Sequence, residues 1–552
     1  RFVFSTIFNQ RDDPWSSEMN ESIKNPSESI GELFLMAYGG LDPEPALTMI
    51  RDYGISGFYL SNDNVPDRKT AQDLSRVLQE ENKKNGQFLP LLLGVDQEGT
   101  WSVMAEDSNP GPGNLALGAA DDPELTRKRY FHLGEELNAC GMNLVFAPCS
   151  DVNTNPSNAI IGMRSFGTDP QKVGAQVVAA VEGLKESGTF STLKHFPGHG
   201  DTFIDSHRAL PTVSRNEKEV REIDLFPFAQ GINAGVDLVM TSHICFEALD
   251  PKKPATFSSL ILNNLLREEL GFDGVVVSDS MNMHSLQKNY DSVDAAVEAL
   301  CSGVDLIMLA EEHYDHDSQY QMRQRRLIEG VQKAFRDGKI PENRIVDAIS
   351  RVRMLKGKIK KVENPRFEDS TWVSSSRESA AKAIRFLQKT DNWKRPEAKQ
   401  RLNLLRAAPS SSYEIVLKTR GIGPNPQQSS FDSLKESLKN HFDVNVLDDI
   451  QNLDGVQDHL IVVFENYTLP GVDFGNNRDE EVIETIKNHF KSEFQKNITF
   501  VAMRDTFNLN LNHPFTTLCA YGFREESSQA IVNMLINPDL KMKEGDIFHS
   551  NH

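Results

Sequence analysis

The sequence of 552 residues predicts an α/β fold, in which a (β/α)8 TIM barrel is followed by a smaller α/β/α sandwich. Over residues 31–360, short β-branched apolar runs alternate with longer amphipathic stretches. The runs are apolar at successive positions, which is typical of strands in a parallel sheet that is covered by helices on both faces. Runs of the same kind return near the C-terminus, after a polar stretch. A chain of this length is also expected to hold two or three domains, each with its own core.

Eight strand-like runs define the first part of the chain. They are residues 33–38, 57–61, 89–96, 142–148, 191–196, 236–243, 274–279 and 304–310. Helical patterns lie between them. In one of these, Asp122 is expected to be the N-cap, with Pro123 at the first helical position and Gly141 at the end. Eight such units in roughly 330 residues predict a TIM barrel, whose active site lies at the carboxyl ends of its strands.

The rest of the chain is divided by composition. We expect an N-terminal extension over residues 1–30, a partly helical linker over 361–400, the sandwich over 401–537 and a polar tail over 538–552. The expected strands of the sandwich are residues 413–419, 459–465 and 498–504. Its acidic residues fall mostly on helical faces, so a solvated surface is expected there and no catalytic constellation.

The charge of the chain restricts its partners. A formal net charge of −20 and a pI near 5.2 argue against nucleic acid and against an acidic membrane surface. A neutral or weakly charged small molecule fits better, and no apolar run is long enough to span a membrane. The first residues lack both Met and the layout of a secretory signal, so we interpret the start as processed or truncated. A cytoplasmic location is favoured and a secreted one stays open; the oligomeric state is not indicated.

The five cysteines are few for this length and odd in number. Three of them lie in apolar runs such as "LVFAPCSD". We interpret all five as buried free thiols, because a disulfide framework uses more cysteines in a shorter chain.

The segment "KHFPGHGDTFIDSHRALP" (194–211) holds three histidines and two aspartates. Pro197 and the two glycines that follow predict a loop. Within it, Asp205 and His207 are two residues apart, so on an extended backbone they project to the same side. The carboxylate would then orient the imidazole as a general acid/base. A purely structural role for this pair stays open.

A metal site in the same segment is the alternative. The candidate ligands would be His195, His199, Asp201, Asp205 and His207. The ligand spacings of a helical metal site are missing, and Pro197 with the next glycine predicts a tight turn. We therefore expect no metal.

Asp279 ends a strand that is apolar enough to be buried on both sides. An unpaired carboxylate there would be costly without a function. Glycoside cleavage uses such a carboxylate opposite a protonatable group on another loop. The alternative, that Asp279 caps a helix beginning near Met283, stays open.

Four segments together resemble the β-N-acetylhexosaminidases of glycoside hydrolase family 3. They are "GVDQEG" (94–99), "FAPCSDVNTNPSNAIIGMRSFG" (146–167), the histidine-rich segment and "VVVSDSMNM" (275–283). The resemblance covers about residues 30–360, in the same order. The second domain resembles its counterpart only in length, order and strand pattern.

The resemblance implies a role for each matched residue. Asp279 would be the nucleophile, and His207 the general acid/base, oriented by Asp205. The residues expected to bind the sugar hydroxyls are Asp96, Arg164, Lys194 and His195. The implied reaction is retaining hydrolysis of a terminal, non-reducing β-linked N-acetylglucosamine, without metal or cofactor.

Three other functions stay open. Neutral imidazole does not repel an anion, so phosphate could replace water and make the chain a phosphorylase. The others are a β-glucosidase of the same family and a binding scaffold without turnover. The sequence also departs from relatives that process bacterial wall fragments, with "EGTWS" (98–102) in place of "EGGRV" and Asn62 in place of arginine. Both changes remove positive charge, so we expect short chitin-derived oligosaccharides and not anionic muropeptides.

Overall fold

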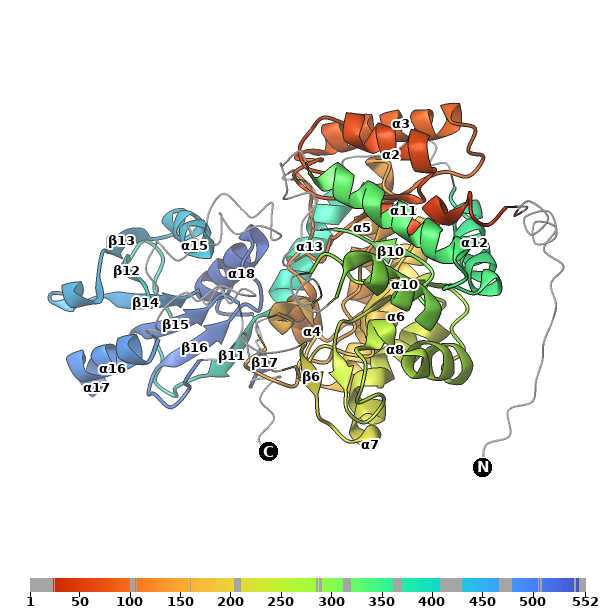
Figure 1. The fold of residues 1–552 in the computed structure, drawn as a ribbon. Helices are drawn as coiled ribbons and strands as arrows, with labels where there is room; N and C mark the ends of the chain where they lie inside the picture. Colours follow the sequence, from red (N-terminus) through yellow and green to blue (C-terminus); the bar gives the residue numbers. More distant parts are fainter. Residues whose placement is uncertain are drawn as a thin grey trace.

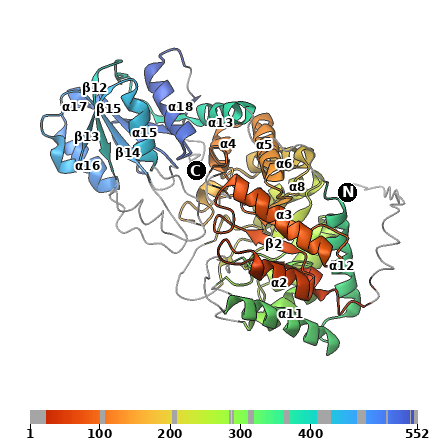
Figure 2. The same cartoon turned by 90° about the horizontal axis from the view of Figure 1, so that it is seen from above.

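The computed structural model describes most of the chain. The described residues are 23, 25–99, 105, 107–158, 160–202, 210–283, 286, 290–310, 319–360, 370–407, 429–465, 479–504, 506, 509–540 and 543–545. Asp205 and His207 lie outside them, as does the expected strand 413–419. Two units lie side by side in both views of the chain (Figures 1 and 2). The smaller, C-terminal unit is coloured blue.

All eight strand-like runs of the first unit contain a strand. The strands are β1 (Phe34–Met36), β2 (Gly57–Leu60), β3 (Leu92–Val95), β4 (Leu144–Val145), β5 (Thr192–Phe196), β7 (Leu238–Thr241), β9 (Val275–Val277) and β10 (Ile307–Met308). They form two parallel sheets, in the orders β10-β1-β2-β3-β4 and β5-β7-β9. Isolated parallel bridges connect the sheets at both seams: Leu144 with Phe190 and Cys149 with Lys194 at one, and Val277 with Leu306 at the other. Two short strands, β6 (Thr212–Val213) and β8 (Cys245–Phe246), pair with each other.

Helices surround these strands (Figure 1). They are α2 (Glu44–Tyr53), α3 (Arg68–Lys84), α4 (Asn114–Ala120), α5 (Pro123–Ala139), α6 (Pro170–Ser187), α7 (Glu217–Glu219), α8 (Leu225–Asn233), α10 (Ser292–Ser302), α11 (Tyr320–Arg336) and α12 (Glu342–Gly357). Helical turns of other types are Ile30–Leu33, Gly162–Arg164, Val220–Asp224, Ala255–Phe257 and Leu260–Glu269. The predicted cap of α5 is confirmed, because the Asp122 carboxylate accepts a hydrogen bond from the Leu125 amide at 3.2 Å. Among the described residues, no helix combines the length and the apolar character that crossing a membrane requires.

The strands bury both faces, which explains their unbroken apolar character. In β1, Phe34 and Met36 belong to the large apolar cluster shared with the helices. Leu35, between them, belongs to a second cluster, which the two sheets share. In β9, Val276 likewise belongs to the cluster shared with the helices, and Val275 and Val277 belong to the second cluster.

The second unit is built on a seven-stranded sheet in the order β13-β12-β14-β15-β16-β11-β17. Its strands are β11 (Arg385–Gln388), β12 (Arg401–Arg406), β13 (Asp443–Leu447), β14 (His459–Phe464), β15 (Ile498–Ala502), β16 (Thr516–Cys519) and β17 (Lys543–Glu544). Its helices are α13 (Ser370–Ala383), α15 (Ser430–Lys439), α16 (Asp479–His489), α17 (Ser492–Gln495) and α18 (Glu525–Ile536), with a 3-10 turn at Ile450–Leu453. The expected strands at 459–465 and 498–504 are present as β14 and β15. Helix α13 and strand β11 lie in the stretch expected to be a linker, and β11 pairs antiparallel with β16 inside the sheet.

All five cysteines are free thiols, as expected. Cys140, Cys149 and Cys519 are buried, but Cys245 and Cys301 are only half-buried. The expectation that all five are buried was therefore wrong for these two. Cys245 lies on the short strand β8 and Cys301 at the end of α10, both outside the two sheets that hold the eight predicted strands.

Candidate active site

Strand ends bring the candidate residues to one end of the first unit. Asp96 directly follows β3, Lys194 and His195 lie in the carboxyl half of β5, and Asp279 comes two residues after β9. Because all of these strands are parallel, their carboxyl ends lie at the same end of the sheets. Arg164 reaches this place from the helical turn Gly162–Arg164.

Lys194 is held between two carboxylates. Its Nζ atom lies 2.7 Å from Oδ1 of Asp96 and 2.5 Å from Oε1 of Glu98. Burial lowers the pKa of Lys194, but the two carboxylates outweigh it and hold the pKa above its ordinary value. The amine is therefore charged, and its position is fixed. The other oxygen of Asp96 accepts a hydrogen bond from the Tyr59 hydroxyl at 2.9 Å.

Glu98 was not among the residues predicted from sequence. It is fully buried and accepts hydrogen bonds from Nε and Nη2 of Arg164 at 2.8 and 2.9 Å. Burial raises the pKa of Glu98, but Arg164 and Lys194 outweigh it and hold the pKa far below its usual range. Burial lowers the pKa of the Arg164 guanidinium, but the ion pair with Glu98 outweighs it and raises the pKa above its ordinary value. The only signal in the sequence was the position of Glu98 in "GVDQEG", two residues beyond the strand-end aspartate.

The ring of His195 is fixed at both nitrogens. Nε2 lies 3.1 Å from Nη2 of Arg164, and Nδ1 lies 2.8 Å from Oδ2 of Asp151. A guanidinium only donates, so Nε2 accepts and the proton of the neutral ring is on Nδ1, facing Asp151. The sequence predicted that His195 lies near the sugar site, but not that a buried carboxylate sets its tautomer.

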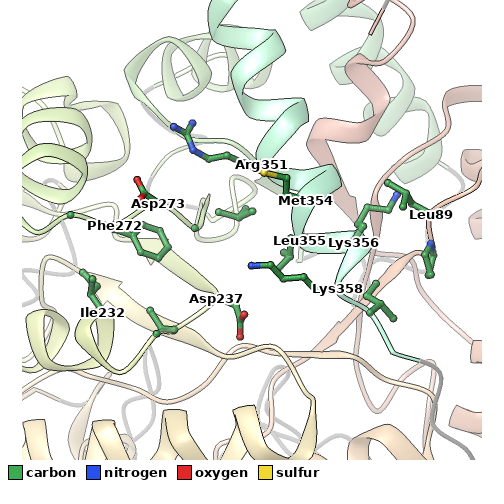
Figure 3. A pocket seen from close by; sticks show the side chains of 18 of the residues that line it. Leu89, Ile232, Asp237, Phe272, Asp273, Arg351, Met354, Leu355, Lys356 and Lys358 are labelled. Atoms are coloured by element: carbon green, nitrogen blue, oxygen red, sulfur yellow. The ribbon is translucent and has the colours of Figure 1, made fainter. Parts of the chain in front are cut away.

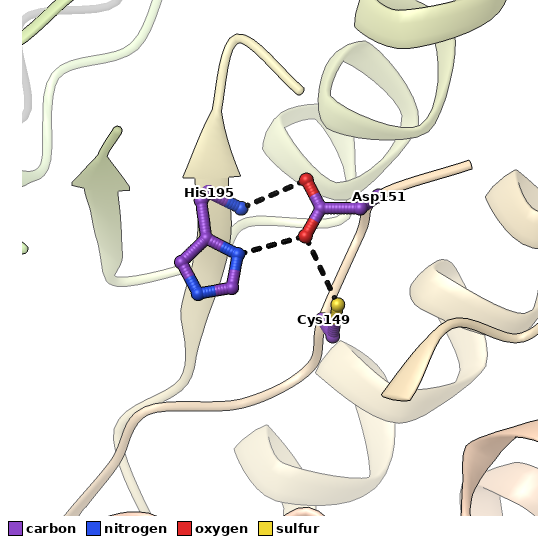
Figure 4. A group of neighbouring side chains, drawn as sticks. All are labelled: Cys149, Asp151 and His195. Carbon is purple, nitrogen blue, oxygen red and sulfur yellow. Dashed lines mark hydrogen bonds and ion pairs between the residues drawn. The ribbon is translucent and has the colours of Figure 1, made fainter. Parts of the chain in front are cut away.

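Asp151 is the second functional residue that sequence reasoning missed. Its carboxylate is buried and accepts four hydrogen bonds. One comes from the ring Nδ1 of His195, and two come from the backbone amides of His195 and His199 at 3.1 and 2.7 Å. The Cys149 thiol donates the fourth at 3.0 Å, and Figure 4 shows the carboxylate between Cys149 and His195. Burial raises the pKa of Asp151, but the histidines and the thiol outweigh it, so the pKa lies below its ordinary value. Asp151 thus connects the loop after β4 to the start of the histidine-rich loop.

Asp279 is half-buried, and Oδ1 accepts a hydrogen bond from the Ser280 amide at 2.7 Å. Burial raises the pKa of Asp279, but His195, His243, the Ser280 amide and Lys194 together hold it below its ordinary value. The carboxylate is therefore ionised near neutral pH. An ionised carboxylate that keeps some exposure is suited to attack an electrophilic carbon.

His243, at the end of β7, supports the backbone next to Asp279. Its Nε2 atom lies 3.1 Å from the Ser280 carbonyl oxygen, and Nδ1 lies 2.9 Å from Oγ1 of Thr256. Burial lowers the pKa of His243. A neutral ring with its proton on Nε2 satisfies this geometry, since a carbonyl oxygen only accepts.

The comparison with known families agrees with the resemblance. The sequence model of the glycosyl hydrolase family 3 N-terminal domain matches residues 28–355. The chain belongs to glycosyl hydrolase family 3. It is 36% identical over 284 residues to Beta-hexosaminidase A of Pseudoalteromonas piscicida, a match that covers 48% of each protein. The chain thus spans about half the length of that relative.

Solved structures of two proteins resemble this family 3 chain over nearly its whole length. A glycoside hydrolase family 3 beta-N-acetylglucosaminidase from Paenibacillus sp. str. FPU-7 superposes with a TM-score of 0.78 at 29% identity, covering 92% of this chain and 96% of that one. The beta-glucoside phosphorylase BglX superposes with a TM-score of 0.77 at 18% identity, over 96% and 95% of the two chains. The second likeness shows a shared fold.

One group of side chains in the described part of this family 3 chain has metal-ligand geometry. The ligand atoms of Cys149, Asp151 and His195 all lie within 4.8 Å of one another. A metal would need the thiolate, but burial raises the pKa of Cys149 well above its ordinary value, and its proton is donated to Asp151. The hydrogen bonds of this group therefore do not fit a resident metal.

The histidine-rich loop does not gather its described metal candidates either. Nδ1 of His199 lies 2.8 Å from Oγ1 of Thr202, and Asp201 forms an ion pair with Arg215 at 3.1 Å. These partners tie the two side chains to different neighbours. Asp205 and His207 lie outside the described residues.

A cavity of about 860 Å³ lies at the opposite end of the strands. Residues that precede β3, β7 and β9 line it together with the last turn of α12, as Figure 3 shows for Asp237, Phe272 and Leu355. Its carboxylate Asp237 already accepts a hydrogen bond from the Ser191 amide at 3.1 Å. Because this cavity faces the amino ends of the strands, it is separate from the candidate active site.

Proposed function

We propose that this chain is a retaining exo-β-N-acetylglucosaminidase that releases terminal, non-reducing N-acetylglucosamine from short chitin-type oligosaccharides. One observation carries the proposal: the ionised Asp279 lies at the same end of the strands as the hydrogen-bonding array of Lys194, Asp96 and Arg164. A nucleophile beside an array that can hold sugar hydroxyls is the arrangement that retaining glycosidases need.

In the first step, the Asp279 carboxylate attacks the anomeric carbon and the bond to the leaving oxygen breaks. His207 donates its proton to that oxygen, and Asp205 orients the imidazole. In the second step, His207 takes a proton from water, whose oxygen attacks the anomeric carbon and releases Asp279. The roles of His207 and Asp205 rest on the sequence resemblance. The ionisation of Asp279 rests on its surroundings in the structure.

The charges of the site favour a neutral substrate. Lys194 and Arg164 are the two cations of the array, and both are ion-paired to Glu98. The carboxylates of the same site are Asp96, Glu98, Asp151 and Asp279. Carboxylates therefore outnumber cations among these described groups, which disfavours an anionic muropeptide.

The same excess of carboxylates bears on the alternatives. BglX is named a beta-glucoside phosphorylase and has this fold, so phosphorolysis is the second candidate. An incoming phosphate would be repelled by the carboxylates, which outnumber the cations among these described groups. The Pseudoalteromonas relative is named a beta-hexosaminidase and the Paenibacillus protein a beta-N-acetylglucosaminidase, which supports hydrolysis of N-acetylglucosaminides over β-glucosides.

Product analysis tests the proposal. The full chain is incubated with an aryl β-N-acetylglucosaminide and with the matching β-glucoside, with and without phosphate, and NMR follows the first product. We expect β-configured N-acetylglucosamine, no cleavage of the glucoside, and loss of turnover in Asp279→Ala with an unchanged fold. A preferred sugar 1-phosphate would replace the proposal by a phosphorylase, and binding without turnover would support a scaffold.

The proposal also includes the architecture of the two units. We infer that the eight parallel strands close into one (β/α)8 barrel over residues 31–360, since parallel bridges link the two sheets at Leu144 and at Val277. The second unit, over residues 401–537 and with β11 and β17 from outside this range also in its sheet, has the layers of an α/β/α sandwich, because separate apolar clusters cover the two faces of its sheet.

A further inference from the structure

The second unit touches the loop that carries Glu98. Nε of Arg524, the residue that precedes α18, donates a hydrogen bond to the carbonyl oxygen of Gly99 at 2.9 Å. Gly99 directly follows Glu98 and has a positive φ of 83°. A Cβ atom there would lie 2.8 Å from the Pro110 carbonyl oxygen, so the loop is tightly packed on its other side. The Gly99 backbone is thus held by the hydrogen bond from Arg524 to its carbonyl oxygen and by close packing at its Cα atom.

The second unit also touches the turn that carries Arg164. Met163, the preceding residue, is buried in an apolar cluster that consists mainly of residues of the second unit. Nε of the buried Arg504, two residues after β15, lies 3.0 Å from the sulfur of Met163. The residue next to Arg164 therefore packs as part of the second unit's core.

Helix α4 makes the third connection. Its Leu115, Ala116 and Ala119 belong to the same apolar cluster as Tyr521 and Phe523 of the second unit. At the start of α4, Nδ2 of Asn114 donates to the carbonyl oxygen of Arg164 at 2.7 Å. The helix thus connects the second unit to the backbone of Arg164.

We propose that the second unit is a positioning element for the substrate-binding array, with Arg524 as a positioning residue. The three contacts hold the backbone next to Glu98 and Arg164, which are bonded to each other, and Glu98 in turn fixes Lys194. The loop that carries Glu98 and the helical turn that carries Arg164 both lie outside the strands, so the sheets do not fix them. A displacement of about 1 Å at such a site is enough to slow catalysis strongly. The inference rests on the proposed function, because it assumes that this array binds the sugar.

Arg524→Met tests the proposal, since it removes the donor and keeps most of the side-chain length. The matched control is Lys543→Met, because Nζ of Lys543 also crosses between the units and donates to the Ala120 carbonyl at 3.0 Å, at the far end of α4. We expect Arg524→Met to lower kcat/KM for the aryl N-acetylglucosaminide about tenfold, mainly through a higher KM. Lys543→Met should stay within about twofold, and Arg524→Lys should recover part of the loss.

Hydrogen exchange measured by mass spectrometry gives a readout without substrate. Peptides that contain Glu98 and Arg164 should exchange faster in Arg524→Met than in Lys543→Met, at equal Tm. Equal kinetics and equal exchange in the two variants would overturn the positioning role and leave Arg524 as an ordinary docking contact. If the wild-type chain does not hydrolyse the substrate, the proposed function fails, and exchange alone still decides whether Arg524 holds the loop.

Discussion

Glu98 and Arg164 form a bidentate ion pair whose carboxylate is completely buried, with N–O distances of 2.8 and 2.9 Å. Lys194 joins the same carboxylate at 2.5 Å. Removing one member of such a pair leaves uncompensated charge in the interior, which costs far more than losing a surface pair. The two cations that we propose to bind the sugar therefore depend on one acidic residue that the proposed chemistry does not use directly.

Replacing Glu98 by Gln should destabilise the chain and impair binding together. We expect the free energy of unfolding to fall by about 3 kcal/mol, because Arg164 and Lys194 lose their shared charge partner. Chemical denaturation measures this fall, and KM for the aryl substrate should rise. Asp73→Asn, which breaks an exposed pair with Lys69, is the control and should leave stability unchanged. Equal effects of the two variants would contradict the role of Glu98.

The stability difference between wild type and Glu98→Gln should depend on pH. The pKa of Glu98 is lower in the folded chain than in the unfolded chain. Its contribution is therefore fully present above the ordinary glutamate value of about 4.3, and is lost as pH falls through the folded value. Denaturation at pH 7 and at steps below pH 4 should show the difference shrinking at the acid end. A constant difference would mean that charge is not its cause.

Asp151→Asn should disturb His195 without removing either side chain. The amide would present a donor to Nδ1, so the ring proton would move to Nε2 and face the donors of Arg164. We expect kcat/KM to fall about 100-fold, by the same tautomer argument that applies to catalytic triads. Kinetics and the 15N chemical shifts of His195 check this.

Cys149→Ala is the matched control for Asp151→Asn, because it removes another donor to the same carboxylate and leaves the Nδ1 contact in place. It should retain activity within about threefold. If both variants lost the same activity with unchanged tautomers, the carboxylate would have only a packing role.

His207→Ala should affect substrates according to their leaving groups. General acid catalysis contributes about 10²- to 10⁴-fold, and a leaving group that is already a weak base does not need the proton. Chitobiose should therefore lose far more rate than a dinitrophenyl glycoside, as measured by kcat/KM for each. An equal loss on both substrates would show that His207 is not the acid.

The strands and the helix start at Asp122 could be predicted from sequence because the information is local. A strand that is buried on both faces, such as the run 274–279, can be recognised from its own apolar residues without knowing which strands lie beside it. The sheet of the second unit was less predictable. Residues 385–388 form β11 inside a stretch whose polar composition indicated a linker, and their pairing with β16 depends on residues more than a hundred positions away.

The order of residues along the chain was enough to nominate the side chains that could do the chemistry: an aspartate at the end of a buried strand, a lysine and a histidine on another strand, and an arginine in a loop. How these side chains are held became visible in the folded chain. Glu98 and Asp151 look like ordinary acidic residues in the sequence, and they became identifiable because folding buries them against Arg164 and His195. Burial strengthens charge interactions and penalises unpaired groups. It depends on contacts between distant segments, which no local pattern records.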